Sequence, residues 1–311
     1  KNIASVDATT VAAFGAAGVG GGVDGLYSWE IIAPGYSATP ANSYGPQSID
    51  TNGNTIITAM GTGNIGRSTN NGLTWTRTQA MTTGASTCIF YNPDLDDWIL
   101  CDFDGRIYRS TNDGVSWTQV RTHAGTQPIT DMVWNGSLYI GSSKGGVATS
   151  PNGVTWTHRS FGGSTAYMDH IAYDGSGTLC VTENYYAGGQ YKLWSSTNGT
   201  SWTFRYTMPQ AASSLEYGNG KFVLITGQKD CVTSTNGINW TQQADIGIGI
   251  YYLHYNGTYF MGAAGGGVYY SANGTSYYGQ DLGSGSVASL SSNSNRVFVA
   301  TSINTCAIAD L

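Results

Sequence analysis

The sequence predicts an all-β fold in which seven four-stranded antiparallel sheets stand around a central axis. Three observations predict it. The composition is typical of short strands and tight turns, a short turn motif recurs six times, and the strand count leaves the first and last segments to complete one sheet. Sheets of this size must bury their faces against one another, and a ring of repeated units does so.

Composition favours strands and turns and argues against several classes of protein. The 311 residues include 44 Gly, 21 Tyr and 9 Trp, and only 10% are charged, against about 25% in average globular domains. With 40% apolar residues, the chain can bury a core. The net charge of −6 and the lack of a basic run argue against a nucleic-acid partner. No apolar run approaches the roughly 18 residues of a membrane span.

A turn motif of seven or eight residues recurs along the chain. The long form spans 68–75 and 110–117, and the short form begins at residues 150, 196, 234 and 271. Its Asn accepts backbone N–H groups and closes the turn, its Gly supplies a positive φ, and its aromatic residue is expected to anchor the next strand by burial. The structural positions are Asn70, Gly72, Trp75, Asn112, Gly114, Trp117, Asn152, Gly153, Trp156, Asn198, Gly199, Trp202, Asn236, Gly237, Trp240, Asn273 and Gly274.

These segments resemble the Asp-box, or BNR repeat, of pattern S-x-D-x-G-x-[ST]-W, with Asn at the Asp position in every copy. The resemblance extends from about Asp24 to the C-terminus and implies a β-propeller. Asp-boxes occur in sialidases, other glycosidases, lectins and non-enzymatic propellers, so the resemblance implies an architecture and no particular activity. The low charge and the Gly, Ser, Thr and Asn content are also similar to those of phage tail and bacterial surface propellers.

Between the turns the chain repeats a meander of four strands in about 40 residues, the size of a propeller blade. In the third unit the predicted strands are 129–134, 138–141, 146–150 and 154–160, with a tight turn at 135–136. The same order predicts strands at 214–217, 221–226, 230–234 and 238–243, and again at 251–255, 258–262, 267–271 and 275–280.

The strand count predicts a seven-bladed β-propeller closed by its N-terminal strand. After Tyr277 the chain holds three predicted strands, at 286–291, 296–301 and 305–311. A fourth is supplied by 26–32, with Trp29 at the anchor position, and this pairing would remove free sheet edges. We therefore predict one propeller domain over 25–311.

Residues 1–24 are predicted to form a leader, either a poorly ordered linker or an anchor that docks into a larger assembly. The segment is rich in Ala and Gly and matches neither a strand nor a capped helix. Because the sequence begins with Lys1, we expect it to be a processed product or a fragment.

The five cysteines show no metal-ligand spacing, and neither a metal nor a cofactor is expected. Cys88 and Cys101 flank a predicted hairpin at nearly matched distances from its turn. A cross-strand disulfide and a pair of small buried thiols both remain open, because a register change of one residue would separate the side chains. An odd number of cysteines argues against a complete disulfide framework.

Two classes of glycosidase can be compared with the acidic and basic residues. A sialidase needs three converging arginines, but the arginines here fall outside the predicted innermost strands. Other glycosidases need two carboxylates about 5–10 Å apart. The innermost strands carry Asp50, Asp131 and Glu216, Asp169 precedes another, and Asp104 and Asp131 come from adjacent blades. The alternative is that these acids are hydrated in a central channel or bond to loop backbone.

Ligand recognition is expected on the face of the ring opposite the Asn-Gly turns. The longest loop there, 184–191, places tyrosines beside amide groups, and such side chains stack on sugars and bond to hydroxyls. Alternatively, these tyrosines pack on their own loop. The candidate ligand-binding residues are Tyr185, Tyr186, Gln190, Tyr191, Phe103, Asp104, Lys144 and Lys229.

The sequence therefore predicts a non-catalytic binding or structural propeller, extracellular or virion-associated. It would recognise a glycan or a partner protein, in receptor binding or surface decoration. The alternative function is a polysaccharide-degrading glycoside hydrolase or lyase that uses the channel carboxylates. A third is a scaffold subunit that enters a larger assembly through residues 1–24.

Overall fold

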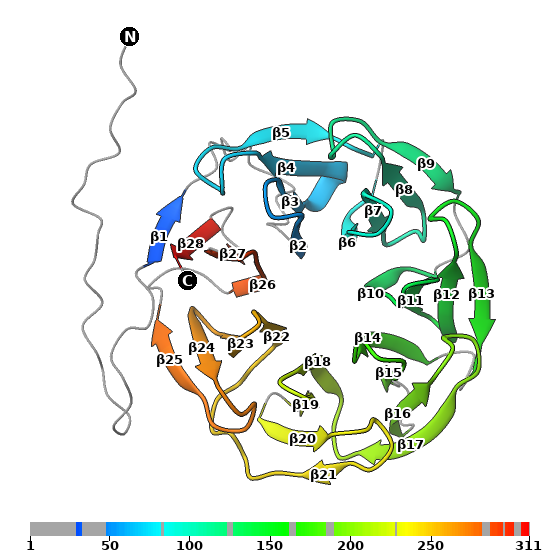
Figure 1. Cartoon of the computed structure of the whole chain (residues 1–311), viewed down its shortest axis with the longest axis vertical. Coiled ribbons are helices and arrows are strands. Elements are labelled where there is room, and N and C mark those ends of the chain that lie inside the picture. The colour runs from blue at the N-terminus through cyan, green and yellow to red at the C-terminus, as the bar shows by residue number, and fades with distance from the viewer. Residues whose placement is uncertain are drawn as a thin grey trace.

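The computed structural model describes residues 29–32, 48–81, 84–122, 127–161, 166–184, 190–227, 229–281, 287–294, 296–301 and 306–310, and the predicted leader lies outside them. Within these ranges the strands form seven four-stranded antiparallel sheets. Figure 1 shows that the sheets stand radially around a common axis, with the first strand of each sheet innermost. The prediction of an all-β propeller of four-stranded antiparallel blades is confirmed.

The first three sheets along the chain are simple meanders. The first contains β2 (Ser48–Thr51), β3 (Ile56–Ala59), β4 (Asn64–Ser68) and β5 (Thr76–Gln79), with a 3-10 turn at Gly61–Gly63. The second contains β6 (Ser86–Asn92), β7 (Asp97–Asp102), β8 (Ile107–Ser110) and β9 (Thr118–Arg121). The third contains β10 (Ile129–Trp134), β11 (Tyr139–Ser143), β12 (Gly146–Ser150) and β13 (Thr157–Ser160).

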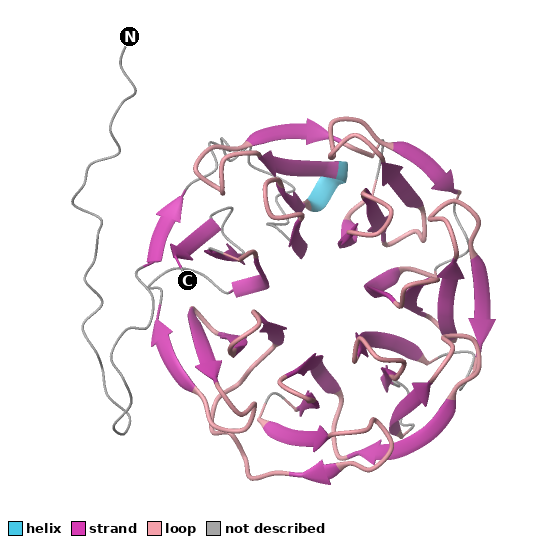
Figure 2. Cartoon of the chain, in the orientation of Figure 1, coloured by secondary structure: helices cyan, strands magenta, loops and turns pink. Residues whose placement is uncertain are grey.

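The next three sheets repeat this order. The fourth contains β14 (Tyr167–Tyr173), β15 (Leu179–Asn184), β16 (Tyr191–Ser196) and β17 (Thr203–Met208). The fifth contains β18 (Ala212–Gly218), β19 (Lys221–Thr226), β20 (Asp230–Ser234) and β21 (Thr241–Gln242). The sixth contains β22 (Tyr252–Tyr255), β23 (Phe260–Ala264), β24 (Gly267–Ser271) and β25 (Tyr278–Asp281). Figure 2 shows how strands dominate these blades.

The last sheet joins the two ends of the described chain. It contains β26 (Val287–Ser292), β27 (Arg296–Thr301), β28 (Cys306–Asp310) and β1 (Trp29–Ile32). β1 pairs antiparallel with β28, and Trp29 lies opposite Ala309. The predicted pairing of the N-terminal strand with the C-terminal sheet is therefore present, and it covers the outer edge of β28.

The fourth strands begin later than the sequence predicts. β13 begins at Thr157 rather than at Val154, because Asn152 Oδ1 accepts the N–H groups of Val154 and Thr155 and holds them in the turn. The innermost strands instead agree well with prediction, although Asp169 lies inside β14 rather than before it.

The Asn-Gly turns are held together by their own side chains. Asn112 Oδ1 accepts the N–H of Ser116, and the Ser110 hydroxyl accepts the N–H of Gly114, each at 2.9 Å. Gly114 has a φ of 76°, and a Cβ atom there would lie 2.3 Å from Ile57 Cδ1 of the preceding blade. Both the backbone conformation and the close approach therefore require glycine.

The tryptophans that follow these turns are half-buried, whereas burial was expected. Trp117 packs at the edge of a core cluster shared by the first two sheets, and its Nε1 donates to Gly114 O at 3.2 Å. Trp75 and Trp156 make the same bond to Gly72 O and Gly153 O, so these three rings close their own turns as well as covering a blade interface. The Nε1 atoms of Trp202 and Trp240 are buried and have no hydrogen-bond partner among the described residues.

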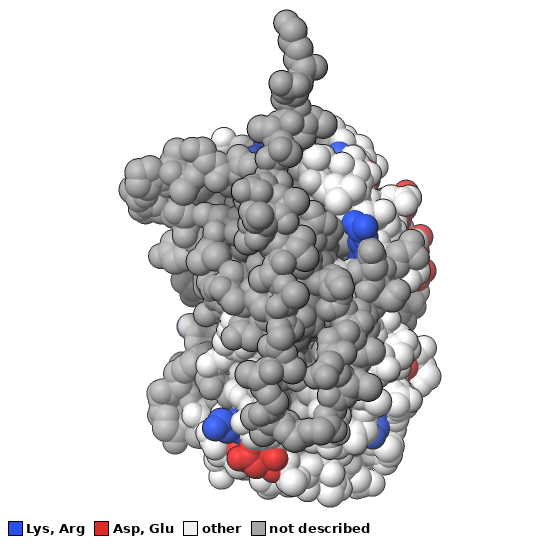
Figure 3. Space-filling view, turned by 90° about the vertical axis from the view of Figure 1, so that its left-hand side faces the viewer, with Lys and Arg blue, Asp and Glu red and all other residues white. Residues whose placement is uncertain are grey.

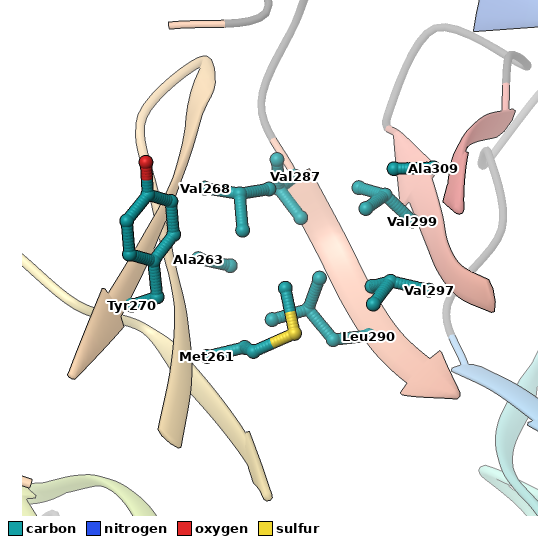
Figure 4. Close-up of a cluster of buried hydrophobic side chains, with 9 residues drawn as sticks. All are labelled: Met261, Ala263, Val268, Tyr270, Val287, Leu290, Val297, Val299 and Ala309. Atoms are coloured by element: carbon teal, nitrogen blue, oxygen red, sulfur yellow. The ribbon is translucent and has the colours of Figure 1, made fainter. Parts of the chain in front are cut away.

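The hydrophobic core is divided among the interfaces between neighbouring blades. In the cluster of Figure 4, Met261 and Val268 of the sixth sheet face Leu290 and Val297 of the last sheet. Similar clusters join the other neighbouring sheets. On the side that Figure 3 shows, few charged side chains appear among the described residues. In the described ranges, no helix is long and apolar enough to cross a membrane.

Four described cysteines, Cys88, Cys101, Cys180 and Cys231, are buried and free. Cys88 lies directly opposite Cys101 across β6 and β7. Of the two alternatives for this pair, the structure has the buried thiols rather than the disulfide.

Candidate binding site in the central cavity

The first strands of all seven sheets line a central cavity of about 1260 Å³. Because the strands of each meander alternate in direction, the turns after first and third strands lie on one face of the ring. We call this the turn face. The loops after second strands and the connections between blades lie on the opposite loop face. The cavity therefore has a turn mouth, where the first strands end, and a loop mouth, where they begin.

Two aspartates on the cavity wall bond to the backbone of the next blade. Asp50 Oδ2 accepts the N–H of Tyr91 at 2.7 Å, and Asp131 Oδ2 accepts the N–H of Ile171 at 3.0 Å. The second oxygen of each carboxylate accepts an N–H from its own strand. First strands have no strand partner on their inner edge, so these carboxylates satisfy backbone groups that would otherwise be unpaired.

Three further titratable side chains also bond to a neighbouring blade, two of them to its backbone and one to a hydroxyl. Glu216 accepts a backbone N–H from the next first strand, β22. His254 Nε2 lies 2.7 Å from the hydroxyl of Ser292 in the last sheet, and the His170 side chain bonds to the backbone of Ala212 in the fifth sheet. Asp50, Asp131 and Glu216 therefore bond to the strand backbone of the next blade, whereas bonds to loop backbone were expected as one of the alternatives.

Burial shifts the pKa values of these groups towards their neutral forms. It raises the pKa of Asp50 and Asp131 to about 6, against the opposing effect of the bonded N–H groups. It raises the pKa of Glu216 to about 8, with a further contribution from the charge of Asp131. It lowers the pKa of His170 to about 4. At neutral pH we therefore expect ionised aspartates, a largely protonated Glu216 and a neutral His170.

The predicted pair of Asp104 and Asp131 is bonded to two different groups. Asp104 lies on the loop after β7, where it forms an ion pair with Arg106 Nη1 at 2.7 Å, while Asp131 is bonded to Ile171. Asp169 accepts the Nδ2 of Asn184 at 2.5 Å. No first strand in the described ranges carries an arginine, so the wall lacks the converging arginines that a sialidase would need.

The predicted ligand-binding residues lie at separate places on the loop face. Phe103 lines the cavity and its side chain is 58% exposed. Gln190 and Lys229 are exposed, and Asp104 is engaged with Arg106. Among the described members of the predicted set, Phe103 is thus the one that lines the cavity.

The predicted ligand-binding loop, residues 184–191, is described only at its ends. Tyr185 and Tyr186 lie outside the described residues. Asn184 is buried, and Tyr191 begins β16 and packs against a core cluster. Lys144, on another loop, places its ammonium group 5.3 Å from the centre of the Tyr167 ring.

Two tyrosines at the loop mouth were missed by sequence reasoning. Tyr251 and Tyr252 line the cavity and are 43% and 39% exposed. The available signal was the Tyr-Tyr pair where a first strand begins, with Tyr252 as the first residue of β22, since adjacent residues of a strand point to opposite sides of the sheet. Together with Phe103 they are called the loop-mouth aromatics. In the described residues no group of three or more His, Cys, Asp or Glu side chains is arranged to hold a metal ion.

Comparison with known proteins supports the fold and leaves the function open. No family model and no curated protein match the sequence. Virginiamycin B lyase from Staphylococcus aureus is similar in structure, with 9% identity, a TM-score of 0.76 and coverage of 92% of this chain and 99% of that chain. A structure of YCF48 bound to D1 peptide has 12% identity, a TM-score of 0.70 and coverage of 91% and 95%. A chain of the mitotic checkpoint complex has 12% identity, a TM-score of 0.69 and coverage of 91% of both chains. At such identities the likeness shows the propeller fold alone.

Proposed function

We propose that this chain is a non-catalytic binding propeller that recognises a glycan or a partner protein at the loop mouth. The observation that carries this proposal is the presence of the loop-mouth aromatics Phe103, Tyr251 and Tyr252 around one end of a wide cavity. Large aromatic side chains that are substantially exposed and border a concavity are typical of recognition sites. The charged groups beside Phe103 are paired with one another, as Arg106 bonds to Asp102 and Asp104, so contact area and hydrogen bonds would dominate binding.

The state of the cavity wall also favours binding over catalysis. Asp50, Asp131 and Glu216 each bond to the backbone of a neighbouring blade, and a hydrolytic acid pair must instead face the substrate. Among the structural neighbours, YCF48 is bound to a peptide, and the mitotic checkpoint complex is a protein assembly. These neighbours illustrate partner binding by the same fold at very low identity.

The wider setting proposed for this chain rests on its sequence. We take the Asn-Gly turns to be Asp-box turns, residues 25–311 to form one seven-bladed ring, and residues 1–24 to dock into a larger assembly. The low charge and the Gly, Ser, Thr and Asn content support an extracellular or virion-associated protein. Deleting residues 1–24 should then prevent assembly without unfolding the ring, as measured by light scattering and circular dichroism.

The proposal is tested by screening the protein on a glycan array and on a peptide array in parallel. We expect a hit in one array that is lost in the triple variant Phe103→Ala/Tyr251→Ala/Tyr252→Ala. Loss should be at least about tenfold in affinity if these side chains form the centre of the contact. The matched control is Phe204→Ala, because Phe204 is 44% exposed on the outer strand β17. Binding unchanged in the triple variant would contradict the proposal.

A polysaccharide-degrading hydrolase or lyase remains the second candidate. The raised pKa of Asp131, about 6, is in a range suited to a general acid, and one structural neighbour is named a lyase. Release of new reducing ends from a polysaccharide, abolished by Asp131→Asn, would establish this function in place of the first.

A further inference from the structure

Five consecutive first strands carry an aromatic residue at or next to their end, and on four of them that residue lines the cavity at the turn mouth; Tyr255 of β22 is not among the lining residues. Tyr91 in β6, Trp134 in β10, Tyr173 in β14 and Tyr217 in β18 each lie at or next to the last residue of the strand. All four are half-buried and line the cavity. We call them the aromatic arc. On the other side of the mouth, β2 ends in a threonine and β26 in a serine, so one side of the mouth is aromatic and the other carries hydroxyl groups.

The inner surface of each ring is fixed by the second strand of the same blade. Trp134 lies opposite Tyr139 in the strand register, with ring centroids 4.8 Å apart. Tyr217 lies opposite Phe222 at the same separation. Because the rings are held from behind, their exposed surfaces are preorganised, and little conformational entropy is lost when a ligand covers them.

Two members of the aromatic arc, Trp134 and Tyr91, have their polar atoms bonded to carboxylates. Trp134 Nε1 donates to Asp94 Oδ2 at 2.6 Å, and the Tyr91 hydroxyl donates to Asp96 Oδ1 at 2.9 Å. These bonds orient the two rings and place carboxylates at the rim, which would repel an anionic ligand.

The two remaining tyrosines keep their hydroxyls free. Over the described part of the chain, the hydroxyls of Tyr173 and Tyr217 have no hydrogen-bond partner, and they come from neighbouring blades. A phenolic hydroxyl both donates and accepts. A ligand that carries hydroxyls at intervals along an apolar face would therefore satisfy both the ring surfaces and these two groups.

A peptide could bind by adding as a strand to the cavity wall, but several backbone N–H groups of the wall already have hydrogen-bond partners. The N–H of Tyr91 is bonded to Asp50, that of Ile171 to Asp131, and that of Leu253 to a serine hydroxyl of the fifth sheet. Strand addition depends on such main-chain groups. The groups that remain are ring faces and hydroxyls, which match the C–H faces and hydroxyls of a sugar.

We propose that the aromatic arc is a second binding site, which takes a neutral oligosaccharide across the turn mouth. Sugar rings stack on Trp134, Tyr173 and Tyr217, and the hydroxyls of the two tyrosines bond to sugar hydroxyls. The carboxylates beside Trp134 and Tyr91 exclude acidic glycans. This site lies at the opposite end of the cavity from the loop-mouth aromatics, so it does not depend on the function proposed above.

The test is isothermal titration calorimetry of the whole chain with cellohexaose, maltohexaose and chitohexaose, and with decaproline as a peptide probe. We expect one of the sugars to bind, and the double variant Tyr173→Ala/Tyr217→Ala to weaken it at least about tenfold. The double variant Tyr173→Phe/Tyr217→Phe keeps the rings and loses two hydrogen bonds, so a smaller loss of about threefold is expected. It also keeps the packing of the blade interface, which guards against a loss caused by unfolding.

Three results would overturn the proposal. One is that no sugar binds at millimolar concentration, and another is that only decaproline binds, which would favour a peptide. The third is that sugar binding survives in the Tyr173→Ala/Tyr217→Ala variant but is lost on Phe103→Ala/Tyr251→Ala. That last result would assign the sugar to the loop mouth, and the function proposed for that mouth would stand while the second site fell.

Discussion

The two mouths of the cavity place aromatic residues in different ways. At the turn mouth, four consecutive blades line the cavity with an aromatic residue at an equivalent strand end, half-buried against its own blade. At the loop mouth, Phe103 comes from a loop of the second blade and Tyr251 and Tyr252 from the start of the sixth, all more exposed. The aromatic residues of the turn mouth thus occupy the same position in successive blades. Those of the loop mouth come from positions particular to the second and sixth blades. Substitutions at the turn mouth should therefore affect stability and binding together, whereas those at the loop mouth should affect binding alone.

The largest expected effect separates a turn-face glycine from a loop-face glycine. Gly199 and Gly265 both have positive φ values, 71° and 54°. A Cβ atom at Gly199 would lie 2.4 Å from Ile140 Cδ1 of the preceding blade, whereas at Gly265 nothing lies within 4 Å. Gly265→Ala should cost about 1 kcal/mol, for its backbone conformation alone. Gly199→Ala adds a clash in a packed interface and should cost about 2–4 kcal/mol.

Urea unfolding of the two glycine variants measures this difference. Equal losses of unfolding free energy would show that the Asn-Gly turns are not locked into their neighbours, and the contrast between the two faces would lose its structural basis. Far-ultraviolet circular dichroism before unfolding confirms that both variants start from the same fold.

The second effect concerns the aromatic residues themselves. Tyr217 is half-buried in a core cluster and its ring lies 4.8 Å from that of Phe222, so Tyr217→Ala should lower the unfolding free energy by about 1–3 kcal/mol. Tyr251 is 43% exposed, and Tyr251→Ala should change stability by less than about 0.5 kcal/mol. A loss at Tyr251 as large as that at Tyr217 would mean that the loop mouth is also part of the structural repeat.

The turns and the strand order were readable from the sequence because their causes are local. Asn112 and Gly114 fix the turn through bonds and a φ value within eight residues of chain, and the turns recur at about 40 residues, the length of one blade. The pairing of Trp29 with the last sheet was inferred from counting strands, since a meander lacking one strand leaves an edge to be covered.

The site was less readable because its causes lie in neighbouring blades. Asp50 bonds to Tyr91, and Asp131 bonds to Ile171. These contacts depend on which first strands lie side by side, and the partners are about 40 residues apart in the chain. The aromatic ends of first strands looked like ordinary strand formers, since Tyr and Trp favour strands. Their exposure to a shared cavity follows from the diameter of the ring, which no local pattern contains.

The smallest expected effect is a pH dependence of stability set by Glu216, which precedes Tyr217 on the cavity wall. Its folded pKa of about 8 lies above the ordinary value of 4.5. A raised pKa contributes stability that is present below about pH 4.5 and is lost as the pH rises through about 8. Glu216→Gln removes this dependence, so its stability relative to the unsubstituted chain should rise by about 1–2 kcal/mol between about pH 5 and pH 9. The value stays modest because the side chain is partly exposed to the cavity.

The matched control for Glu216 is Asp50→Asn, because Asp50 makes the same bridge between blades with a pKa of only about 6. The stability difference for Asp50→Asn should therefore change between about pH 4 and pH 6 and then stay level, while that for Glu216→Gln continues to change up to about pH 8. Either substitution also alters a hydrogen bond, which shifts the whole curve without changing its shape. Thermal unfolding across this pH range gives both curves. Two curves that level off at the same pH would mean that Glu216 titrates like Asp50, and that the wall nearest the aromatic arc is no more strongly desolvated than the first blade.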